Sequence, residues 1–217
     1  MADYTWVDLQ IPEAILLSDL SGVLLDLQRA RQFAEMLAVQ LAAEKPNWEI
    51  VEPLSIAATV AYSRPFTGGV RTHLAEEDLE ILSPEQRAAH DYLRAYRDKH
   101  VAHSVNAFEQ NDVRAYYCIE RVQDEGITSI GLGSRRITGL SHGDVESIIK
   151  LTTVFETHVQ SKIRMEEVRL LSIVQSKPLK DVLDCGRQVW PDDLRSKVKE
   201  KRKLVSRRAA KSRKTGR

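Results

Sequence analysis

The sequence predicts a mainly α-helical protein, an antiparallel helical bundle with one inserted β-hairpin and a basic C-terminal tail. Two long segments, about residues 12–44 and 141–176, repeat apolar residues at alternating steps of three and four, as amphipathic helices do. Between them, residues 113–134 become rich in β-branched and aromatic side chains, which is typical of strands. The length of 217 residues fits one domain with an appendage. We therefore expect a helical domain over 1–190 and a tail over 191–217.

The first helix is expected from about Pro12 to Glu44, because Pro12 suits a first turn and Pro46 follows the expected end. Gly22 lies inside this helix, where a glycine costs about 1 kcal/mol of stability relative to Ala. We interpret it as a position of close packing against a neighbouring helix. The side chains expected to be buried share one stripe: Leu16, Leu20, Val23, Leu27, Ala30, Ala34, Leu37 and Leu41.

A shorter helix is expected over Leu54–Tyr62, with Pro53 at its first position and Arg64-Pro65 at its end. One or two helical turns are expected within 72–82. Ser83-Pro84-Glu85-Gln86 then combines a capping Ser, a Pro at the first position and a Gln at the third, which predicts a helix from Pro84 to about Val101.

Residues 113–122 and 127–134 are expected to pair as a hairpin, with Gly126 in the turn at positive φ. Ser141, with Asp144 three residues later, caps the last long helix. A short helix should follow over 179–185. The stripe expected to be buried on the long helix comprises Val145, Ile148, Thr152, Phe155, Val159 and Ile163.

The net charge of +1 conceals two oppositely charged parts. Residues 195–217 hold twelve Lys or Arg and one Glu, whereas the other 194 residues hold 20 basic and 30 acidic side chains. Two cysteines cannot form a disulfide framework or a four-cysteine zinc site. The N-terminus lacks a signal-peptide pattern, and no apolar run is long enough to span a bilayer. We expect a cytoplasmic protein that requires no cofactor and does not bind a membrane.

Residues 90–104 concentrate the side chains that could carry chemistry, among them Arg94, Arg97, Asp98, His100 and His103. Histidine moves protons near neutral pH, and arginine forks onto phosphates. Together they are the minimum for cleaving RNA through its own 2′-hydroxyl without a metal. The alternative is a solvated helix face, since an Arg followed by a His at similar spacing also occurs elsewhere in the chain. A metal site built on His100 and His103 is not favoured, because nothing in the sequence fixes further ligands nearby.

Two segments resemble the HEPN superfamily, in particular its abortive-infection U-type branch. The first is Arg97-Asp98-Lys99-His100-Val101-Ala102-His103-Ser104, and the second is Ala61-Tyr62-Ser63-Arg64-Pro65-Phe66. The order of the expected elements is also similar, and the resemblance covers roughly residues 12–175.

The resemblance implies an all-helical homodimer in which two motifs meet to form one metal-independent ribonuclease site. By this likeness Arg97 binds the scissile phosphate, His103 is the general acid or base, and Asp98 orients the pair. Lys99 and His100 are possible auxiliary residues. In an ideal helix positions 97 and 103 are about 240° apart. Either the helix breaks near Val101, or the two side chains act on opposite sides of a dimer site.

The tail is expected to contact nucleic acid without sequence specificity. The alternatives are that the tail is solvated, or that it contacts the acidic body of a second protomer. The cations expected to bind phosphates are Arg195, Lys197, Lys199, Lys201, Arg202, Lys203, Arg207, Arg208, Lys211, Arg213 and Lys214.

Two functions remain open from the sequence. The first is a metal-independent endoribonuclease, which by the family likeness is a bacterial toxin or phage-defence effector with a possible cognate antitoxin protein. The alternative is a non-catalytic interaction module whose tail binds RNA or a partner.

Overall fold

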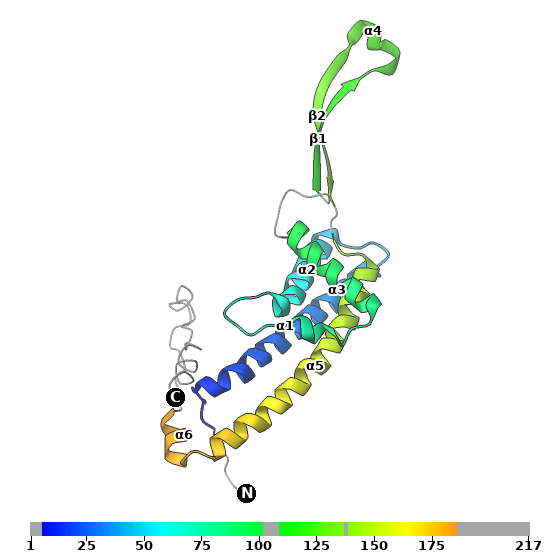
Figure 1. The fold of residues 1–217 in the computed structure, drawn as a ribbon. Coiled ribbons are helices and arrows are strands. Elements are labelled where there is room, and N and C mark those ends of the chain that lie inside the picture. The colour runs from blue at the N-terminus through cyan, green and yellow to red at the C-terminus, as the bar shows by residue number, and fades with distance from the viewer. Residues whose placement is uncertain (1–5, 102–108, 137–138, 186–217) are drawn as a thin grey trace. The chain divides into compact units, whose positions relative to one another are not determined.

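The computed structural model describes residues 6–101, 109–136 and 139–185 (Figure 1). Within these ranges the chain is mainly helical and carries one two-stranded antiparallel sheet, which confirms the expected class. The helices are α1 (Ile15–Leu41), α2 (Trp48–Ser63), α3 (Pro84–Tyr96), α4 (Val122–Glu125), α5 (His142–Gln175) and α6 (Leu179–Cys185). The strands are β1 (Glu109–Tyr117) and β2 (Ile127–Arg136).

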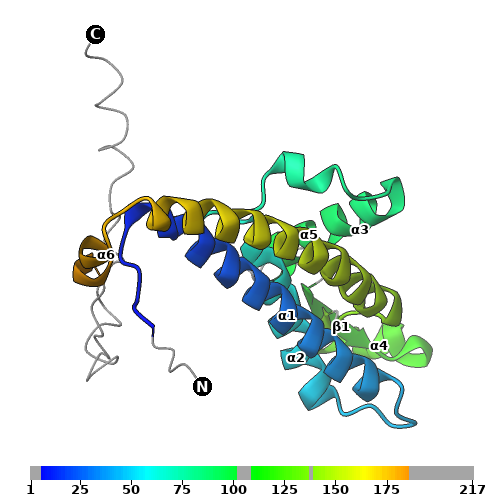
Figure 2. The same ribbon diagram turned by 90° about the horizontal axis from the view of Figure 1, so that it is seen from below.

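The long helices α1 and α5 lie side by side and run in opposite directions, as Figure 1 and Figure 2 show from two sides. The chain divides into two compact units, one containing the described parts of 1–24, 67–73 and 157–217, the other 25–66 and 74–156. In the first unit Arg169 Nη2 donates to the Glu13 carbonyl oxygen at 2.9 Å. In the second unit Arg31 Nε and Nη2 donate to the two carboxylate oxygens of Glu156 at 2.9 and 3.1 Å.

The apolar stripes of the two long helices form much of the core. On α1 the predicted positions from 20 to 37 are buried, whereas Leu16 is 39% exposed and Leu41 is half-buried. On α5 the predicted positions from 145 to 159 are buried and Ile163 is half-buried. The side chains of α1 and α5 that are at most 4% exposed include Leu20, Val23, Leu27, Ala30, Ala34, Leu37, Val145, Ile148, Leu151, Thr152, Phe155 and Val159.

The observed start of α2 differs from the predicted start. The helix begins at Trp48 instead of Leu54, and Pro53 lies inside it. Asn47 is the cap, because its Oδ1 accepts a hydrogen bond from Glu49 N at 3.0 Å. A proline at this position removes one backbone hydrogen bond, which the cap and the buried face of the helix offset. The end at Ser63, followed by a 3₁₀ turn over Arg64–Phe66, agrees with the predicted stop at Arg64-Pro65.

The hairpin is present, but its first strand is shifted relative to the predicted 113–122. The strand β1 begins at Glu109 and ends at Tyr117, and residues 119–125 form helical turns. Gly126 has φ +61°, as its place in the turn predicted. The β-branched Ile119 and Val122 therefore did not identify a strand, because the helical turns of the connection contain such residues too.

Gly22 makes the predicted close approach, but to a loop instead of a helix. A Cβ at this position would lie 2.9 Å from Arg71 Nη1. The loop that contains Arg71 is held on α1, because the buried Asp19 accepts a hydrogen bond from Thr72 N at 2.9 Å. The helical turn expected within 72–82 is a 3₁₀ helix, Glu76–Leu79.

We predict that Phe155→Ala lowers the free energy of unfolding by about 3–5 kcal/mol, because the ring is fully buried and its loss leaves a cavity. Urea unfolding measures the change. Val168→Ala on the same helix is the control, since Val168 is 70% exposed and should change stability by less than about 0.5 kcal/mol. Equal effects of the two variants would contradict the packing described for α5.

Candidate functional site

The helix α3 presents the motif residues at its C-terminal end. Its start is fixed by the predicted capping box: Ser83 Oγ accepts from Gln86 N at 3.2 Å, and Gln86 Oε1 accepts from Ser83 N at 3.0 Å. Its inner face buries His90, Leu93 and Tyr96, which are three residues apart. Burial of Tyr96 directs the next residues, which begin the motif, out of the core.

The helix changes from α to π winding at the motif. Residues Arg97–Val101 form a single π-helical turn, so the predicted helix does reach Val101. Within Arg97–Val101 the winding is no longer α-helical, and the expected offset between positions 97 and 103 lies partly outside the described residues. Such turns occur frequently at functional sites.

The structure brings Arg97 and Asp98 together. Arg97 Nη1 donates to Asp98 Oδ1 at 2.8 Å, and the two side chains are 36% and 56% exposed. This contact uses one of the five N–H donors of the guanidinium group. An exposed guanidinium that a neighbouring carboxylate orients is able to bind a phosphate.

The other predicted site residues are not all described. Lys99 is exposed on the π-helical turn, and of His100 only the backbone is described. His103 lies outside the described residues, as do all eleven predicted phosphate contacts within 195–214.

Two carboxylates near the motif were not predicted as site residues. Burial, together with the neighbouring Tyr92, Asp144 and Glu52, raises the pKa of Tyr96 to about 12. Glu52 comes from α2, and Asp144 comes from the first turn of α5, where its Oδ2 accepts from Ser141 N at 2.9 Å. The capping signal Ser141–Asp144 located Asp144 in its helix, but no sequence pattern connected either carboxylate to the motif.

The chain returns from the hairpin onto the same part of α2. Leu140 N donates to Ser55 Oγ at 3.1 Å, and Ser55 Oγ donates to the Val51 carbonyl oxygen at 2.7 Å. A Cβ on Gly139 would lie 2.8 Å from Ser55 Oγ, so glycine permits this approach. Gly139 and Leu140, which follow the hairpin in the chain, thus lie beside the turn of α2 that carries Glu52.

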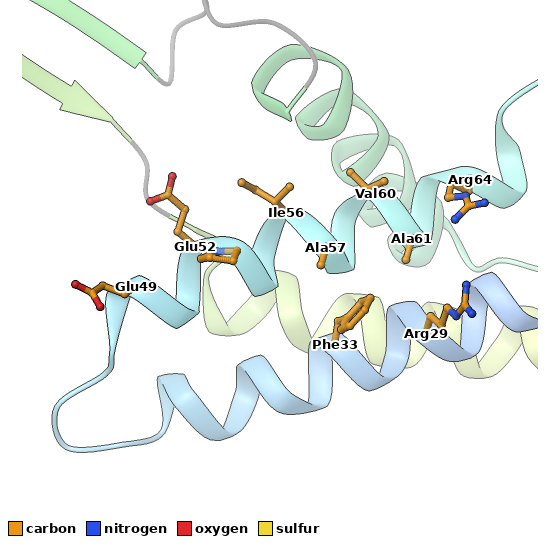
Figure 3. A pocket seen from close by; sticks show the side chains of 10 residues that line it. Arg29, Phe33, Glu49, Glu52, Ile56, Ala57, Val60, Ala61 and Arg64 are labelled. Atoms are coloured by element: carbon orange, nitrogen blue, oxygen red, sulfur yellow. The ribbon is translucent and has the colours of Figure 1, made fainter. Parts of the chain in front are cut away.

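An open groove of about 700 Å³ lies between α1 and α2 and was not predicted (Figure 3). Arg29 and Arg64 lie toward one end of it and Glu49 and Glu52 toward the other, as Figure 3 shows. Arg64 Nη1 is 3.4 Å from Asp26 Oδ1. The remaining lining is apolar and consists of Phe33, Pro53, Ile56, Ala57, Val60 and Ala61.

The second segment of the resemblance, Ala61–Phe66, belongs mostly to the core. The Tyr62 hydroxyl and His90 Nδ1 share a buried hydrogen bond of 2.8 Å. The Phe66 ring centroid lies 4.6 Å from that of His90 and 4.9 Å from that of Phe155. These four residues form one aromatic cluster, defined as Tyr62, Phe66, His90 and Phe155.

Burial, together with the positive charge of Arg94, lowers the pKa of His90 from 6.5 to about 4. His90 is therefore neutral at pH 7 and serves the core, not proton transfer with solvent. The described residues contain no group of three or more His, Cys, Asp or Glu that could hold a metal ion.

Comparison of the chain with protein-family models, curated proteins and solved structures finds no significant match. Over the described ranges, no helix is long and apolar enough to cross a membrane.

We predict that the protein loses stability as the pH falls from about 6.5 to about 4, because of His90. In this window the unfolded chain binds a proton that the folded protein excludes, so acid favours unfolding. The contribution of His90 to the free energy of unfolding amounts to roughly 3 kcal/mol. It is fully present above pH 6.5 and is lost progressively as the pH falls to about 4.

Urea unfolding at a series of pH values across the window measures this effect. In His90→Gln the dependence should be shallower, because an amide does not titrate. His73→Gln, at an exposed position, should keep the dependence of the unmodified protein. An unchanged pH dependence in His90→Gln would refute the assignment.

Proposed function

We propose that this protein is a metal-independent endoribonuclease of HEPN type. The observation that carries the proposal is the exposed Arg97–Asp98 pair, held at 2.8 Å where α3 changes to π winding. His103 follows six residues later in the sequence. The strongly basic tail supports RNA as the substrate, because dense positive charge attracts phosphates.

In the proposed mechanism Arg97 binds the scissile phosphate and stabilises the charge that develops on its oxygens. His103 takes the proton from the 2′-hydroxyl, whose oxygen attacks phosphorus while the bond to the 5′-oxygen breaks. The imidazolium then gives the proton to the leaving oxygen. The products are a 2′,3′-cyclic phosphate and a 5′-hydroxyl.

The remaining predicted residues act around this pair. Asp98 orients Arg97 through the ion pair described above, and Lys99 and His100 add positive charge or a second proton carrier. In the proposed homodimer two motifs share one site. Its biological role would be that of a bacterial toxin or phage-defence effector, controlled by a cognate antitoxin protein, in the cytoplasm.

A non-catalytic interaction module is the second candidate. The observation that favours it is the large exposed apolar surface of the hairpin, where Leu132 is 84% and Val113 is 74% exposed. Surfaces of this kind mark protein contacts.

We predict that Arg97→Ala and His103→Ala each reduce RNA cleavage by about 10²–10⁴-fold, because one removes phosphate stabilisation and the other removes proton transfer. Cleavage of end-labelled bacterial RNA in EDTA measures the loss, and a cyclic-phosphate end on the product identifies the chemistry.

Two matched variants control this experiment. Arg87→Ala removes another arginine of α3 that pairs with carboxylates, those of Glu76 and Asp91. His73→Ala removes an exposed histidine that is not part of the motif. Both should cleave like the unmodified protein. If the unmodified protein binds RNA without cleaving it, the interaction module is the function that remains. If all variants cleave RNA equally, Arg97 and His103 are not the catalytic residues.

We predict that neutralising three tail cations, in Lys201→Gln/Arg202→Gln/Lys203→Gln, makes RNA binding less dependent on salt. Each phosphate contact contributes about 0.7 to the slope of log affinity against log salt for a single strand, so the slope should fall by up to about 2. Fluorescence anisotropy across a salt series measures it. Lys150→Gln/Arg164→Gln, outside the tail, is the control, and equal slopes in all proteins would exclude the tail from binding.

A further inference from the structure

The two faces of the hairpin differ in chemistry. In the antiparallel register Val113 lies opposite Leu132, Ala115 opposite Ile130, and Tyr117 opposite Ile127. These cross-strand pairs share one side of the ribbon, because side chains alternate along β1. In β2 the register shifts between the partners of Tyr116 and Tyr117, which brings Ile127, three residues from Ile130, opposite Tyr117. We call this surface the apolar face, defined as Val113, Ala115, Tyr117, Ile127, Ile130 and Leu132. These six residues include no charged side chain, whereas the pairs Asn111–Ser134 and Glu109–Arg136 continue the same side of the ribbon beyond Val113 and Leu132.

The opposite face is polar and is covered by its own side chains. A Cβ on Gly131 would lie 2.7 Å from the Tyr116 ring, and one on Gly133 would lie 2.1 Å from Arg114 Cζ. The Tyr116 and Arg114 side chains therefore lie across these two glycines of β2. Asp112, opposite Gly133, adds a negative charge to this face.

The apolar face is open to solvent. The exposed fractions are 84% for Leu132, 74% for Val113, 66% for Ile130, 60% for Ile127 and 55% for Tyr117. A two-stranded hairpin is marginally stable in water unless another element covers its apolar side. Such a concentration of exposed apolar side chains indicates an interaction surface.

We propose that the apolar face packs against the apolar face of a second copy of this chain. Two uncharged faces of the same composition meet without burying an unpaired charge, which would oppose association. At roughly 150 Å² for each of the five large side chains, of which about two-thirds is exposed, the two faces together bury about 1,000 Å², the area that a specific interface requires.

The charges around the apolar face argue against a lipid surface or a nucleic acid as the occupant. The connection at its far end contains Glu120, Arg121, Asp124 and Glu125, a net negative charge that anionic lipids and phosphates repel. Arg121 is paired with Glu125 there. The partner that remains is an uncharged protein surface. A second copy of this chain provides such a surface, because every copy carries the same apolar face.

This interface goes beyond the proposed nuclease, because it requires no catalysis and no RNA.

Sedimentation velocity of the full chain over a range of concentrations tests the proposal. The unmodified protein should dimerise, and Leu132→Glu and Val113→Glu should each weaken the dimer at least 100-fold, because a carboxylate would be buried in the interface. Ser129→Glu, on the polar face of β2, is the matched control and should dimerise like the unmodified protein. Circular dichroism should show equal helix content in all four proteins.

Three results would overturn the proposal. They are an unmodified protein that stays monomeric up to high micromolar concentration, a dimer that tolerates both apolar-face substitutions, and a dimer that Ser129→Glu disrupts to the same degree. None of them depends on RNA cleavage, so a failed interface and a failed nuclease are distinguishable.

Discussion

The structure depends on one buried polar contact inside an aromatic environment, the hydrogen bond between Tyr62 and His90. It joins α2 to α3, and the rings of Phe66 and Phe155 surround it, which adds α5 to the same contact. A neutral imidazole satisfies the tyrosine hydroxyl and avoids the cost of a buried charge. Because this cluster sets how α3 lies on α2, it also determines where the end of α3 and the Arg97–Asp98 pair are presented.

Much of the fold could be predicted, because its signals are local. The spacing of apolar residues identified both long helices, and Ser83–Gln86 and Ser141–Asp144 fixed two helix starts through hydrogen bonds that the structure contains. The start of α2 could not be predicted from Pro53, because the Asn47 cap outweighs the preference of proline for a first turn. The end of β1 was missed because β propensity depends on context, and here the connection is helical.

The candidate site was predictable only where its parts are neighbours in the sequence. Arg97 and Asp98 are adjacent, so their pairing follows from the motif. Glu52 reaches the vicinity of Tyr96 from α2 and Asp144 reaches it from α5, and this proximity results from tertiary packing that no sequence spacing records. The π-helical turn over Arg97–Val101 likewise has no signal in the sequence, and the placement of His103 relative to Arg97 lies outside the described residues.

The antiparallel arrangement of α1 and α5 has a consequence for the order of folding. Arg31 and Glu156 are 125 residues apart, so their ion pair requires the closure of most of the chain. The hairpin pairs neighbours in sequence and needs only a short loop, whose entropy cost is much smaller. Sequence-distant contacts slow folding, so β1 and β2 should pair early while the long helices dock last. Until that docking, the apolar stripe of α1 stays exposed, and the newly made chain is then most prone to aggregate.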